Sequence, residues 1–285
     1  MIRKTIVRII SSNITPYVVI IVIAFFLLTP YYWIFISSLK TREEIFTLPP
    51  TFIPKKVTLD AYIKLFFYKG TRAKPIDYFI NTLIIAGSAT LIVGLASTFT
   101  AYGLSQYRYK GSELLAKLYL LTRTIPPLSL LISFYQMYVQ LGLTNNLLSV
   151  IIWTVYMSYP FQTWLIKLFF DSFPKELIDS AKVDGCSRTG TLFRIVLPVT
   201  APAIAAMSVL VFMSGWSVFI APMIFIHTQS KMPIAVGIWD YVGDEYTWWN
   251  DVAAFGMIGC IPTLIFFILA QKHIMKGLAA GALKY

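Results

Sequence analysis

The residues best suited to chemistry in this sequence gather in one polar segment, Ser172–Pro198, which lies between two largely apolar stretches. The segment holds seven charged side chains: Lys175, Glu176, Asp179, Lys182, Asp184, Arg188 and Arg194. No nucleophile in it is evidently paired with a base. The pattern therefore favours binding to another molecule over catalysis.

Other kinds of reactive site find no support in the sequence. No G-x-x-x-x-G-K-[ST] run is present to cradle nucleotide phosphates. His227 and His273 lie far apart, and no Cys or carboxylate cluster has metal-ligand spacing. Cys186 and Cys260 are too few for a disulfide framework. We therefore expect no catalytic residue, no cofactor and no metal site in this chain, and we expect that it is not an enzyme.

The polar segment is predicted to begin with a short helix. Pro174 suits the first turn, because a backbone N–H at that position would have no partner within the helix, and proline lacks one. Glu176 places a negative charge where the helix dipole favours one. Leu177, Ile178 and Ala181 are spaced to share one face.

Gly185 is a natural stop for that helix, and Ser187 can cap a second one that runs through Leu192 and ends at Pro198. The two helices would present an apolar face and an acidic flank to a groove on another protein. The acidic flank consists of Glu176, Asp179 and Asp184. A hairpin lying on lipid would instead favour Lys and Arg on its polar face.

The composition places the chain in a membrane. Of its 285 residues, 57% are hydrophobic and only 13% are charged, whereas soluble domains are about a quarter charged. The formal charge is +11, but the basic residues flank apolar segments and form no long cluster. This charge fits loops that fix membrane orientation better than it fits a nucleic-acid partner.

Crossing the hydrocarbon layer takes about 20 apolar residues, and the sequence supplies six such stretches. We predict an all-α membrane protein with six transmembrane helices in residues 15–274, between an N-terminus at 1–14 and a tail at 275–285. The spans are roughly Thr15–Leu39, Tyr78–Leu104, Leu114–Gln140, Leu147–Phe170, Ala201–Ile226 and Ala253–Ile274.

Lys and Arg in the loops predict the orientation. The distribution of Lys and Arg over most loops predicts that both termini and the polar segment 172–198 lie in the cytoplasm. Loops 40–77 and 227–251 would then lie outside. Loop 40–77 disagrees, because it carries eight basic residues. It also contains four prolines, and we expect it to fold locally.

Small residues recur every fourth position in the second predicted span, at Ala86, Thr90, Gly94 and Thr98. This spacing lets helices approach closely in a membrane. The partner helix could belong to the same subunit or to a second one.

The polar segment resembles the EAA motif, E-A-A-x3-G-x9-I-x-L-P, of the permeases of binding-protein-dependent ABC importers. Asp179-Ser180-Ala181, Gly185 and Ile195-Val196-Leu197-Pro198 fall at its offsets. Asp179 replaces the motif's Glu, and Ser180 replaces its first Ala.

The resemblance extends over nearly the whole chain and is closest to the maltose-type sugar permeases. The matching runs are Phe161–Leu165, Phe173–Leu177, Trp248-Trp249, Ala253-Ala254, Pro262 and the tail Gln271–Lys284. One departure is Trp216-Ser217-Val218, where the family often has Trp-Asn-acidic.

The resemblance implies a type I ABC importer-like fold in the plasma membrane of a prokaryote. The implied partners are a second homologous permease, two cytoplasmic ATPase subunits and an external solute-binding protein. The implied ATPase-docking residues are Glu176, Leu177, Asp179, Ser180, Ala181, Asp184, Gly185 and Leu192. The implied tail contacts with the ATPase are Gly277, Gly281 and Lys284, and those with the binding protein are Asp240, Asp244 and Glu245.

A path for solute is less clear in the sequence. Arg123, beside Pro126-Pro127, is a strong charge inside an apolar span, and it could form a gate or snorkel to the interface. The aromatic residues that could stack on sugar rings include Tyr135, Tyr156 and Trp216. Aromatic side chains in membrane helices also serve in packing and at the lipid interface.

Two other hypotheses compete with an ATP-driven sugar importer. An ion-coupled transporter that needs no ATPase predicts intramembrane carboxylates and inverted repeats, and the sequence shows almost none of the former and no repeat. An importer of the same class for a non-sugar solute stays open, and so does a scaffold or sensor that transports nothing.

Overall fold

The computed structural model describes residues 15–67, 74–107, 109–242 and 247–282, and in this part of the chain every regular element is helical. Side chains after Ile268 are described only at Gln271. The α-helices are α2 (Thr15–Ser38), α3 (Arg42–Ile45), α4 (Asp60–Phe67), α5 (Pro75–Gln106), α6 (Ser112–Leu121), α7 (Pro127–Gln140), α8 (Leu147–Asp171), α9 (Lys175–Val183), α10 (Arg188–Thr191), α11 (Leu197–Trp216), α12 (Ile220–Phe225), α13 (Ile234–Gly237) and α14 (Trp249–Ala282). Single turns η1 (Thr122–Thr124), η2 (Leu192–Val196), η3 (Gln229–Lys231) and η4 (Ile238–Tyr241) complete the order.

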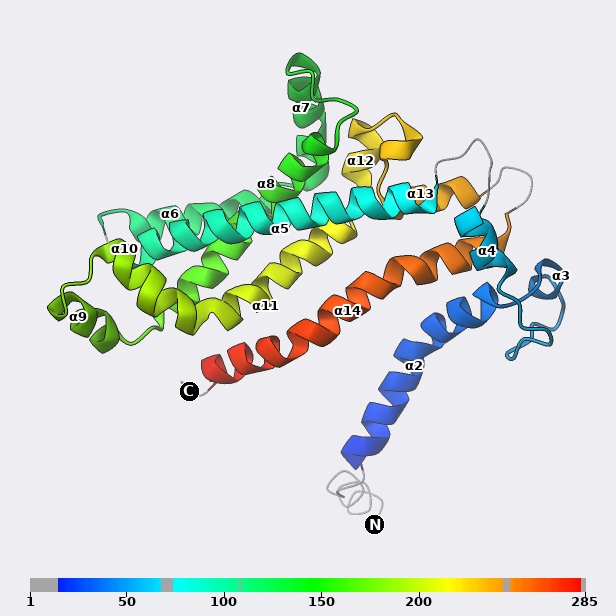
Figure 1. Cartoon of the computed structure of the whole chain (residues 1–285), viewed down its shortest axis with the longest axis horizontal. Helices are drawn as coiled ribbons and strands as arrows, with labels where there is room; N and C mark the ends of the chain where they lie inside the picture. The colour runs from blue at the N-terminus through cyan, green and yellow to red at the C-terminus, as the bar shows by residue number, and fades with distance from the viewer. Residues whose placement is uncertain (1–14, 68–73, 108, 243–246, 283–285) are drawn as a thin grey trace, which may run out of the picture. The chain divides into compact units, whose positions relative to one another are not determined.

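The chain divides into two compact units. The first unit comprises residues 1–69 and 238–258, which include α2, α3, α4 and the start of α14. The second unit comprises residues 70–237 and 259–285, in which α5 and α8 lie side by side and α11 packs against both (Figure 1). The polar segment 172–198 therefore belongs to the second unit.

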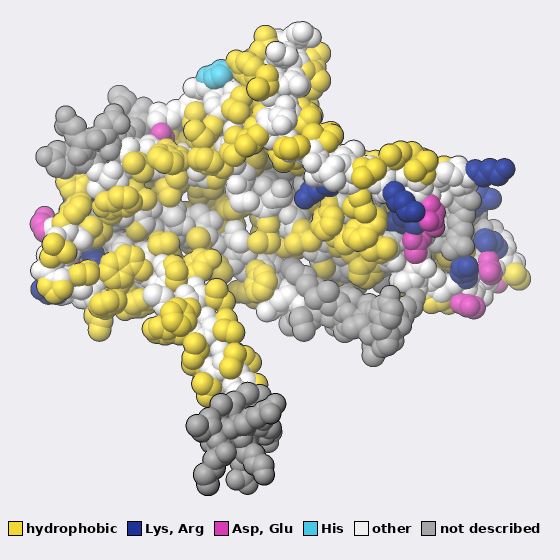
Figure 2. All heavy atoms as spheres, turned by 180° about the vertical axis from the view of Figure 1, so that it is seen from behind, with side chains coloured by type: hydrophobic (Ala, Val, Ile, Leu, Met, Phe, Trp, Pro, Cys, Tyr) yellow, Lys and Arg dark blue, Asp and Glu magenta, His cyan; other side chains and the backbone are white. Residues whose placement is uncertain are grey.

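Four helical stretches of the described chain are long and apolar enough to cross a membrane: Thr15–Ser38, Pro75–Gln106, Arg188–Trp216 and Trp249–Ile268. Figure 2 shows hydrophobic side chains covering α2, while charged side chains collect around α9 and α10. α8 has 25 residues and matches the predicted fourth span, but it buries polar Thr154, Ser158, Gln162 and Thr163. Residues 15–67, 74–107, 109–242 and 247–282 are thus all-helical in their regular structure, with four or five apolar spans, and six crossings stay a prediction.

The predicted third span, Leu114–Gln140, is wrong as one continuous helix. Ser112–Thr124 and Pro127–Gln140 meet at an angle of 93°. Pro126 and Pro127 cause the break, because neither can donate a backbone hydrogen bond and each ring crowds the preceding turn. The pair counts as a fifth span only if both arms form one crossing.

The predicted fifth span also ends early. α11 stops at Trp216, and α12 begins only at Ile220. The hydroxyl of Ser217 donates to the carbonyl of Met213 at 2.8 Å, and Pro222 lacks the N–H that a continuous helix would need. In contrast, α14 continues past the predicted end of the sixth span to Ala282.

The small residues of α5 pack within the subunit. Ala86 is fully buried, and a Cβ added to Gly215 of α11 would lie 2.8 Å from its Cα. A Cβ on Gly94 would meet the hydroxyl of Ser208, also on α11, at 3.4 Å. The small residues at every fourth position therefore allow the close approach of α5 to α11. This favours a partner helix in the same subunit over one in a second subunit.

Replacing Gly215 with alanine should destabilise the chain by about 1–3 kcal/mol, because the new methyl group forces two helix backbones apart. Gly87→Ala is the matched control, since a Cβ there meets nothing within 4 Å. Thermal unfolding of both variants in detergent checks the prediction. An unchanged midpoint for Gly215→Ala would mean that α5 and α11 are not packed so closely.

The part of the first loop between Lys40 and Lys55 is held by internal hydrogen bonds, as expected for local folding. The carbonyl of Thr51 accepts a hydrogen bond from Lys40, whose side chain is buried. The carboxylate of Glu44 accepts from the Thr51 hydroxyl and from the backbone N–H of Lys55, both at 2.8 Å. Arg42 pairs with Asp251 at 3.1 Å and stacks on Trp248 at 3.7 Å. Lys40 and Arg42, two of the basic residues described in this loop, thus have partners inside the fold.

The hydrogen bond from the Lys55 N–H, helped by the one from Thr51, lowers the pKa of Glu44 below its ordinary value of 4.5. A carboxylate with a lowered folded pKa stabilises the fold above its unfolded pKa, and that contribution is lost as the pH falls through the folded value. Wild-type residues 44–58 should therefore be better protected from hydrogen exchange than those of Glu44→Gln at neutral pH. The difference should shrink well below pH 4.5. Equal protection at neutral pH would contradict this role.

Candidate functional site

The first helix of the polar segment ends in a left-handed glycine, as predicted. α9 follows the N-cap Pro174. At its end, the N–H of Cys186 donates to the carbonyl of Ala181 at 2.9 Å, and that of Gly185 donates to the carbonyl of Lys182 at 3.1 Å. Gly185 has φ +77°. These two bonds and the positive φ define a Schellman motif, which sets the direction in which the chain leaves α9.

The second helix is capped as predicted but ends differently. The hydroxyl of Ser187 accepts from the N–H of Gly190 at 3.1 Å and starts α10. Pro198 does not end the helix. The chain continues through one π-helical turn, Leu192–Val196, into α11, and Pro198 lies in the first turn of α11. The wider turn, closed by a bond from the Leu197 N–H to the Leu192 carbonyl, accommodates a residue that cannot donate.

The inner face of the segment is buried in the second unit. Ile178, Ala181, Leu192 and Val196 are each at most 6% exposed. Ile178, Leu192 and Val196 form one cluster with side chains from α5, α8 and α11: Ala101, Tyr102, Ile166, Phe170 and Met207. The phenol of Tyr102 also donates to the carbonyl of Arg188 at 3.2 Å. A movement of the segment would therefore be passed directly to the ends of three long helices.

The outer face is open to a partner. Six of the predicted docking residues are exposed: Glu176, Leu177, Asp179, Ser180, Asp184 and Gly185. Ala181 and Leu192 are only 2% and 3% exposed, so direct contact with a partner is wrong for these two, and they seat the segment instead. Leu177, 47% exposed, does not share the buried face of Ile178 and Ala181.

Sequence reasoning missed two exposed apolar side chains, Val183 at 88% and Phe193 at 56%. The signal was present, because Val183 follows Asp179 by one helical turn and so shares its exposed face. The outer face thus combines apolar anchors with charges. Asp179 and Lys182 form an exposed pair at 2.8 Å, which contributes little stability.

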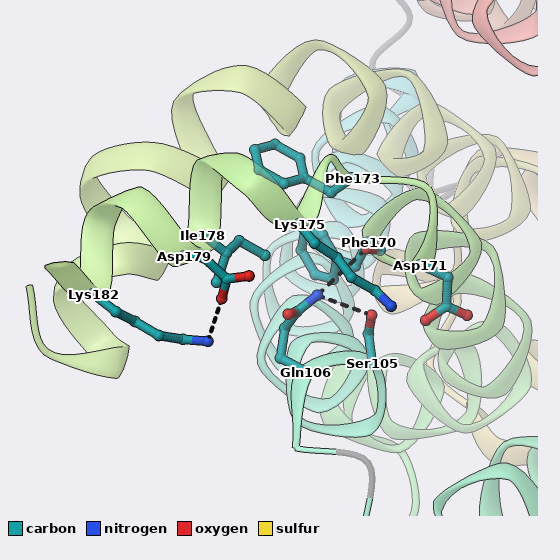
Figure 3. Close-up of a pocket in the computed structure, with 9 residues that line it drawn as sticks. All are labelled: Ser105, Gln106, Phe170, Asp171, Phe173, Lys175, Ile178, Asp179 and Lys182. Atoms are coloured by element: carbon teal, nitrogen blue, oxygen red, sulfur yellow. Dashed lines mark hydrogen bonds and ion pairs between the residues drawn. The ribbon is translucent and has the colours of Figure 1, made fainter.

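A polar pocket lies between α9 and the ends of α5 and α8 (Figure 3). The amide of Gln106 donates to the Ser105 hydroxyl at 3.2 Å and to the Phe170 carbonyl at 3.4 Å. The other lining residues are Asp171, Phe173, Lys175, Ile178, Asp179 and Lys182. A side chain of a partner could form hydrogen bonds with the polar groups of this pocket, which lies beside the exposed face of α9.

The remaining predicted contact residues are described only in part. Gly277 and Gly281 lie in the helical backbone of α14, and Lys284 lies outside the described residues. Asp240 lies half-buried in the turn η4. Asp244 and Glu245 lie outside the described residues.

Arg123 lies in η1, at the break between α6 and α7. Its guanidinium donates to the carbonyl of Met157 at 2.8 Å and lies 5.5 Å from the ring of Phe161. Pro160 interrupts the hydrogen bonding of α8 near this point. The charge therefore ties the broken span to the middle of α8.

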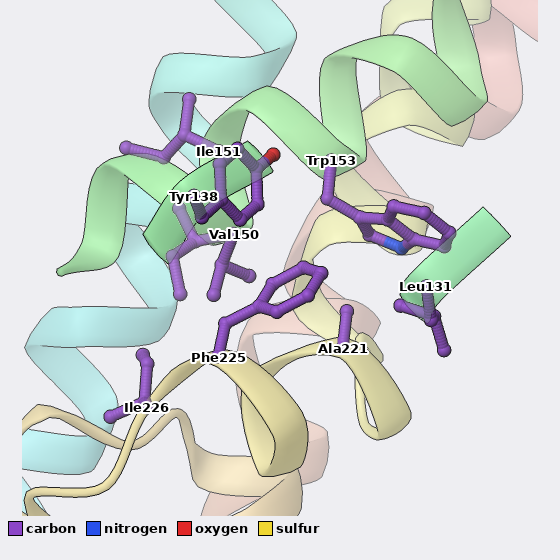
Figure 4. Packing of buried hydrophobic residues seen from close by; sticks show 9 residues of the cluster. Leu131, Tyr138, Val150, Ile151, Trp153, Ala221, Phe225 and Ile226 are labelled. Atoms are coloured by element: carbon purple, nitrogen blue, oxygen red, sulfur yellow. The ribbon is translucent and has the colours of Figure 1, made fainter. Parts of the chain in front are cut away.

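Tyr135 and Tyr156 lie in an aromatic cluster of α7, α8 and α12, whose buried members include Trp153 and Phe225 (Figure 4). The ring of Tyr156 is 5.0 Å from that of Phe134, and both tyrosines keep part of their surface exposed. Trp216 is different. It is 5% exposed, and its indole N–H donates to the Gly259 carbonyl at 2.9 Å. A solute contact by Trp216 is therefore wrong, since the ring is used in packing.

Among the described residues, no three His, Cys, Asp or Glu side chains are grouped to hold a metal ion. The polar segment 172–198 has an exposed outer face and a buried inner face, and this arrangement suits the docking of another protein.

Comparison with known proteins agrees with this geometry. Residues 94–279 match the family model for the binding-protein-dependent transport system inner membrane component. The sulfoquinovosyl glycerol transport system permease protein SmoH of Agrobacterium fabrum is 31% identical over 90% of this chain and 89% of its own. The trehalose/maltose transport system permease protein MalG of Thermococcus litoralis is 31% identical over 93% and 94%.

Solved structures agree on the fold. A chain of a bacterial ABC transporter involved in the import of the acidic polysaccharide alginate aligns with a TM-score of 0.78 at 21% identity, over 91% of this chain and 95% of that one. Together with the family match over residues 94–279, this leads to one conclusion. The chain belongs to the family of binding-protein-dependent transport system inner membrane components, and it is a multi-pass permease of a prokaryotic plasma membrane.

Proposed function

We propose that this chain is one permease subunit of an ATP-driven, binding-protein-dependent sugar importer. It forms half of the translocation path beside a second, homologous permease. Two ATPase subunits dock on the outer face of segment 172–198, in the cytoplasm, and hydrolyse ATP there. The permease itself catalyses nothing.

The observation that carries this proposal is the two-faced construction of the segment. Its outer face exposes Leu177 and Val183 among charged residues, and aliphatic anchors of this kind can be seated in pockets on a partner. Its inner face is buried on α5, α8 and α11. A partner that pulls on the outer face therefore moves the helices that surround the path, as in rigid-body switching between two states.

The substrate class comes from the relatives. The names of the relatives at 30–31% identity refer to sulfoquinovosyl glycerol, to trehalose and maltose, and to galactooligosaccharides. The partly exposed Tyr135 and Tyr156 offer rings on which sugars stack, since apolar sugar faces pack against aromatic side chains. We therefore propose a sugar or oligosaccharide as the substrate.

The remaining predicted contacts follow from this assignment. Gly277, Gly281 and Lys284 of the tail contact the ATPase dimer, and Asp240, Asp244 and Glu245 contact an external binding protein. One solved relative is a bacterial alginate ABC transporter in complex with a periplasmic protein bound to an alginate pentasaccharide, with a TM-score of 0.68 at 18% identity, over 94% of each chain. That complex supports an external partner for this chain.

Uptake by proteoliposomes tests the proposal. The complex that co-purifies with this chain should take up a labelled oligosaccharide into proteoliposomes only when ATP is supplied on the side of the membrane that carries the ATPase subunits. Uptake by the purified chain alone, driven by a proton or sodium gradient, would instead establish an ion-coupled transporter. ATP-driven uptake of a polyol or amino acid without competition from sugars would remove the sugar assignment and keep the importer.

A further inference from the structure

Residues 46–57, between α3 and α4, expose an unusual number of large apolar side chains. Phe46 is 60% exposed, Leu48 91%, Phe52 67%, Ile53 76% and Val57 66%. All five lie within twelve residues of one loop. Contiguous exposed apolar surface of this kind marks a binding site or a membrane contact.

The loop is attached to a membrane-spanning helix. The phenol of Tyr32, in α2, donates to the carbonyl of Phe52 at 2.6 Å. The rings of Trp33 and Phe52 meet edge to face at 5.7 Å. The N–H of Thr58 donates to the carbonyl of Leu39 at 2.9 Å. The loop therefore folds back alongside the last two turns of α2 rather than extending away from it.

The point of attachment identifies the depth. Tyr31, Tyr32 and Trp33 form an aromatic run near the end of α2, after a long uncharged apolar stretch. Tyr and Trp gather at the boundary between hydrocarbon and headgroups. Tyr32 is six residues from the helix end at Ser38, which is about 9 Å along the axis. Phe52 is thus held at the level of Tyr32 and Trp33 in α2.

Two further observations agree with a lipid environment. Lys55 and Lys56 lie between the exposed Ile53 and Val57 and are themselves exposed, so they can reach lipid phosphates just above the apolar layer. An apolar groove within the same unit lies beside the loop and is lined by Trp33, Ile34, Phe46, Trp249 and Val252. It continues the hydrophobic surface of α2.

We infer that residues 46–57 form a membrane-inserting loop, which places Phe46, Leu48, Phe52 and Ile53 in the phospholipid interface and Lys55 and Lys56 among anionic headgroups. Lys40 donates a hydrogen bond to the Thr51 carbonyl, and the Glu44 carboxylate accepts from Thr51 and Lys55. These bonds hold the loop in this shape. The proposed orientation makes this the outer leaflet. The loop thereby anchors the end of α2 at a fixed depth while other helices move.

Fluorescence quenching in the full-length complex tests the inference. In a background with Cys186→Ser and Cys260→Ser, an environment-sensitive fluorophore is attached at Ile53→Cys or, as the control, at Ser230→Cys in the exposed turn η3. The complexes are placed in nanodiscs of phosphatidylethanolamine and phosphatidylglycerol. Lipids that carry a doxyl group near the headgroup end report membrane contact, and iodide reports exposure to water.

Position 53 should be quenched several-fold more by the doxyl lipid than position 230, and several-fold less by iodide. A second label at Leu48→Cys should behave like position 53. If positions 48 and 53 are quenched by iodide as strongly as position 230, the inference is overturned, and the apolar loop is a surface for a soluble protein. The result does not depend on the identity of the transported solute.

Discussion

Replacing Gly185 with valine is expected to lower ATP-driven uptake by more than about tenfold while the purified chain still folds. A β-branched residue cannot adopt φ +77° without a cost of about 1–2 kcal/mol, so the Schellman motif at the end of α9 will rearrange. The inner face keeps its buried anchors, but the outer face will point in a different direction. In the proposed mechanism, coupling to the ATPase depends on that direction, whereas folding of the chain does not. Uptake and thermal unfolding, measured on the same preparation, check both parts.

The chain contains a matched control for this prediction. α7 also ends in a Schellman motif, in which the N–H of Leu143 donates to the carbonyl of Tyr138 at 2.8 Å and the N–H of Gly142 donates to that of Val139 at 3.2 Å. Gly142 has φ +65°, and a Cβ at either glycine meets nothing within 4 Å. Gly142→Val therefore brings the same local strain at a site away from segment 172–198 and should retain most of the uptake. Equal losses in the two variants would mean that strain, and not coupling, explains the effect of Gly185→Val.

Replacing Leu177 with glutamate is expected to separate the permease from its ATPase. Fully burying a leucine side chain is worth about 1.5–3 kcal/mol, so placing a carboxylate there should weaken the complex by more than about tenfold. Leu177 is 47% exposed and belongs to no described internal cluster, so the chain alone should stay folded. Co-purification of the ATPase with a tagged permease measures the effect.

Leu141→Glu provides the comparison, because Leu141 is exposed at 62% at the end of α7. It adds the same charge outside the proposed docking surface and should leave co-purification unchanged. If Leu177→Glu retains the ATPase as well as Leu141→Glu does, the outer face of α9 is not the docking surface.

Local signals in the sequence predicted the local features of the polar segment correctly. A glycine after a short amphipathic run and a serine three residues before Gly190 are sufficient to indicate a stop and a cap, because these motifs depend on neighbouring backbone groups alone. The fate of Pro198 was predicted wrongly. Whether a proline ends one helix or begins the next depends on packing, and the buried Leu192 and Val196 hold the chain continuous into α11.

Properties that depend on distant residues could not be predicted. Leu177, Ile178 and Ala181 are all apolar or small, and only the packing of Ile178 against α5 and α8 shows which side is buried. Trp216 looked available for a sugar, but its indole is bonded to Gly259, 43 residues away. Pro126-Pro127 stands out in the sequence, but the stretch Leu114–Gln140 is long and apolar enough for one crossing, and the prediction of one span rested on that length.

The basic residues of loop 40–77 are not all free surface charges. Counting basic residues makes the loop look cytoplasmic. The side chain of Lys40 is buried and donates a hydrogen bond to the Thr51 carbonyl. Arg42 forms an ion pair with Asp251 and stacks on the ring of Trp248. A count of free loop charges should leave out these two, although Lys55 and Lys56 of the same loop are exposed.

The central claim is that the outer face of α9 contacts an ATPase. Photo-cross-linking from position 177 in the membrane tests it most directly, with a photoreactive amino acid at Leu177 and, as the control, at the exposed Leu141. The account predicts a cross-link from position 177, and none from position 141, to a chain that mass spectrometry identifies by its nucleotide-binding P-loop. Cross-links from position 177 to lipid alone, or to no ATPase, would contradict it.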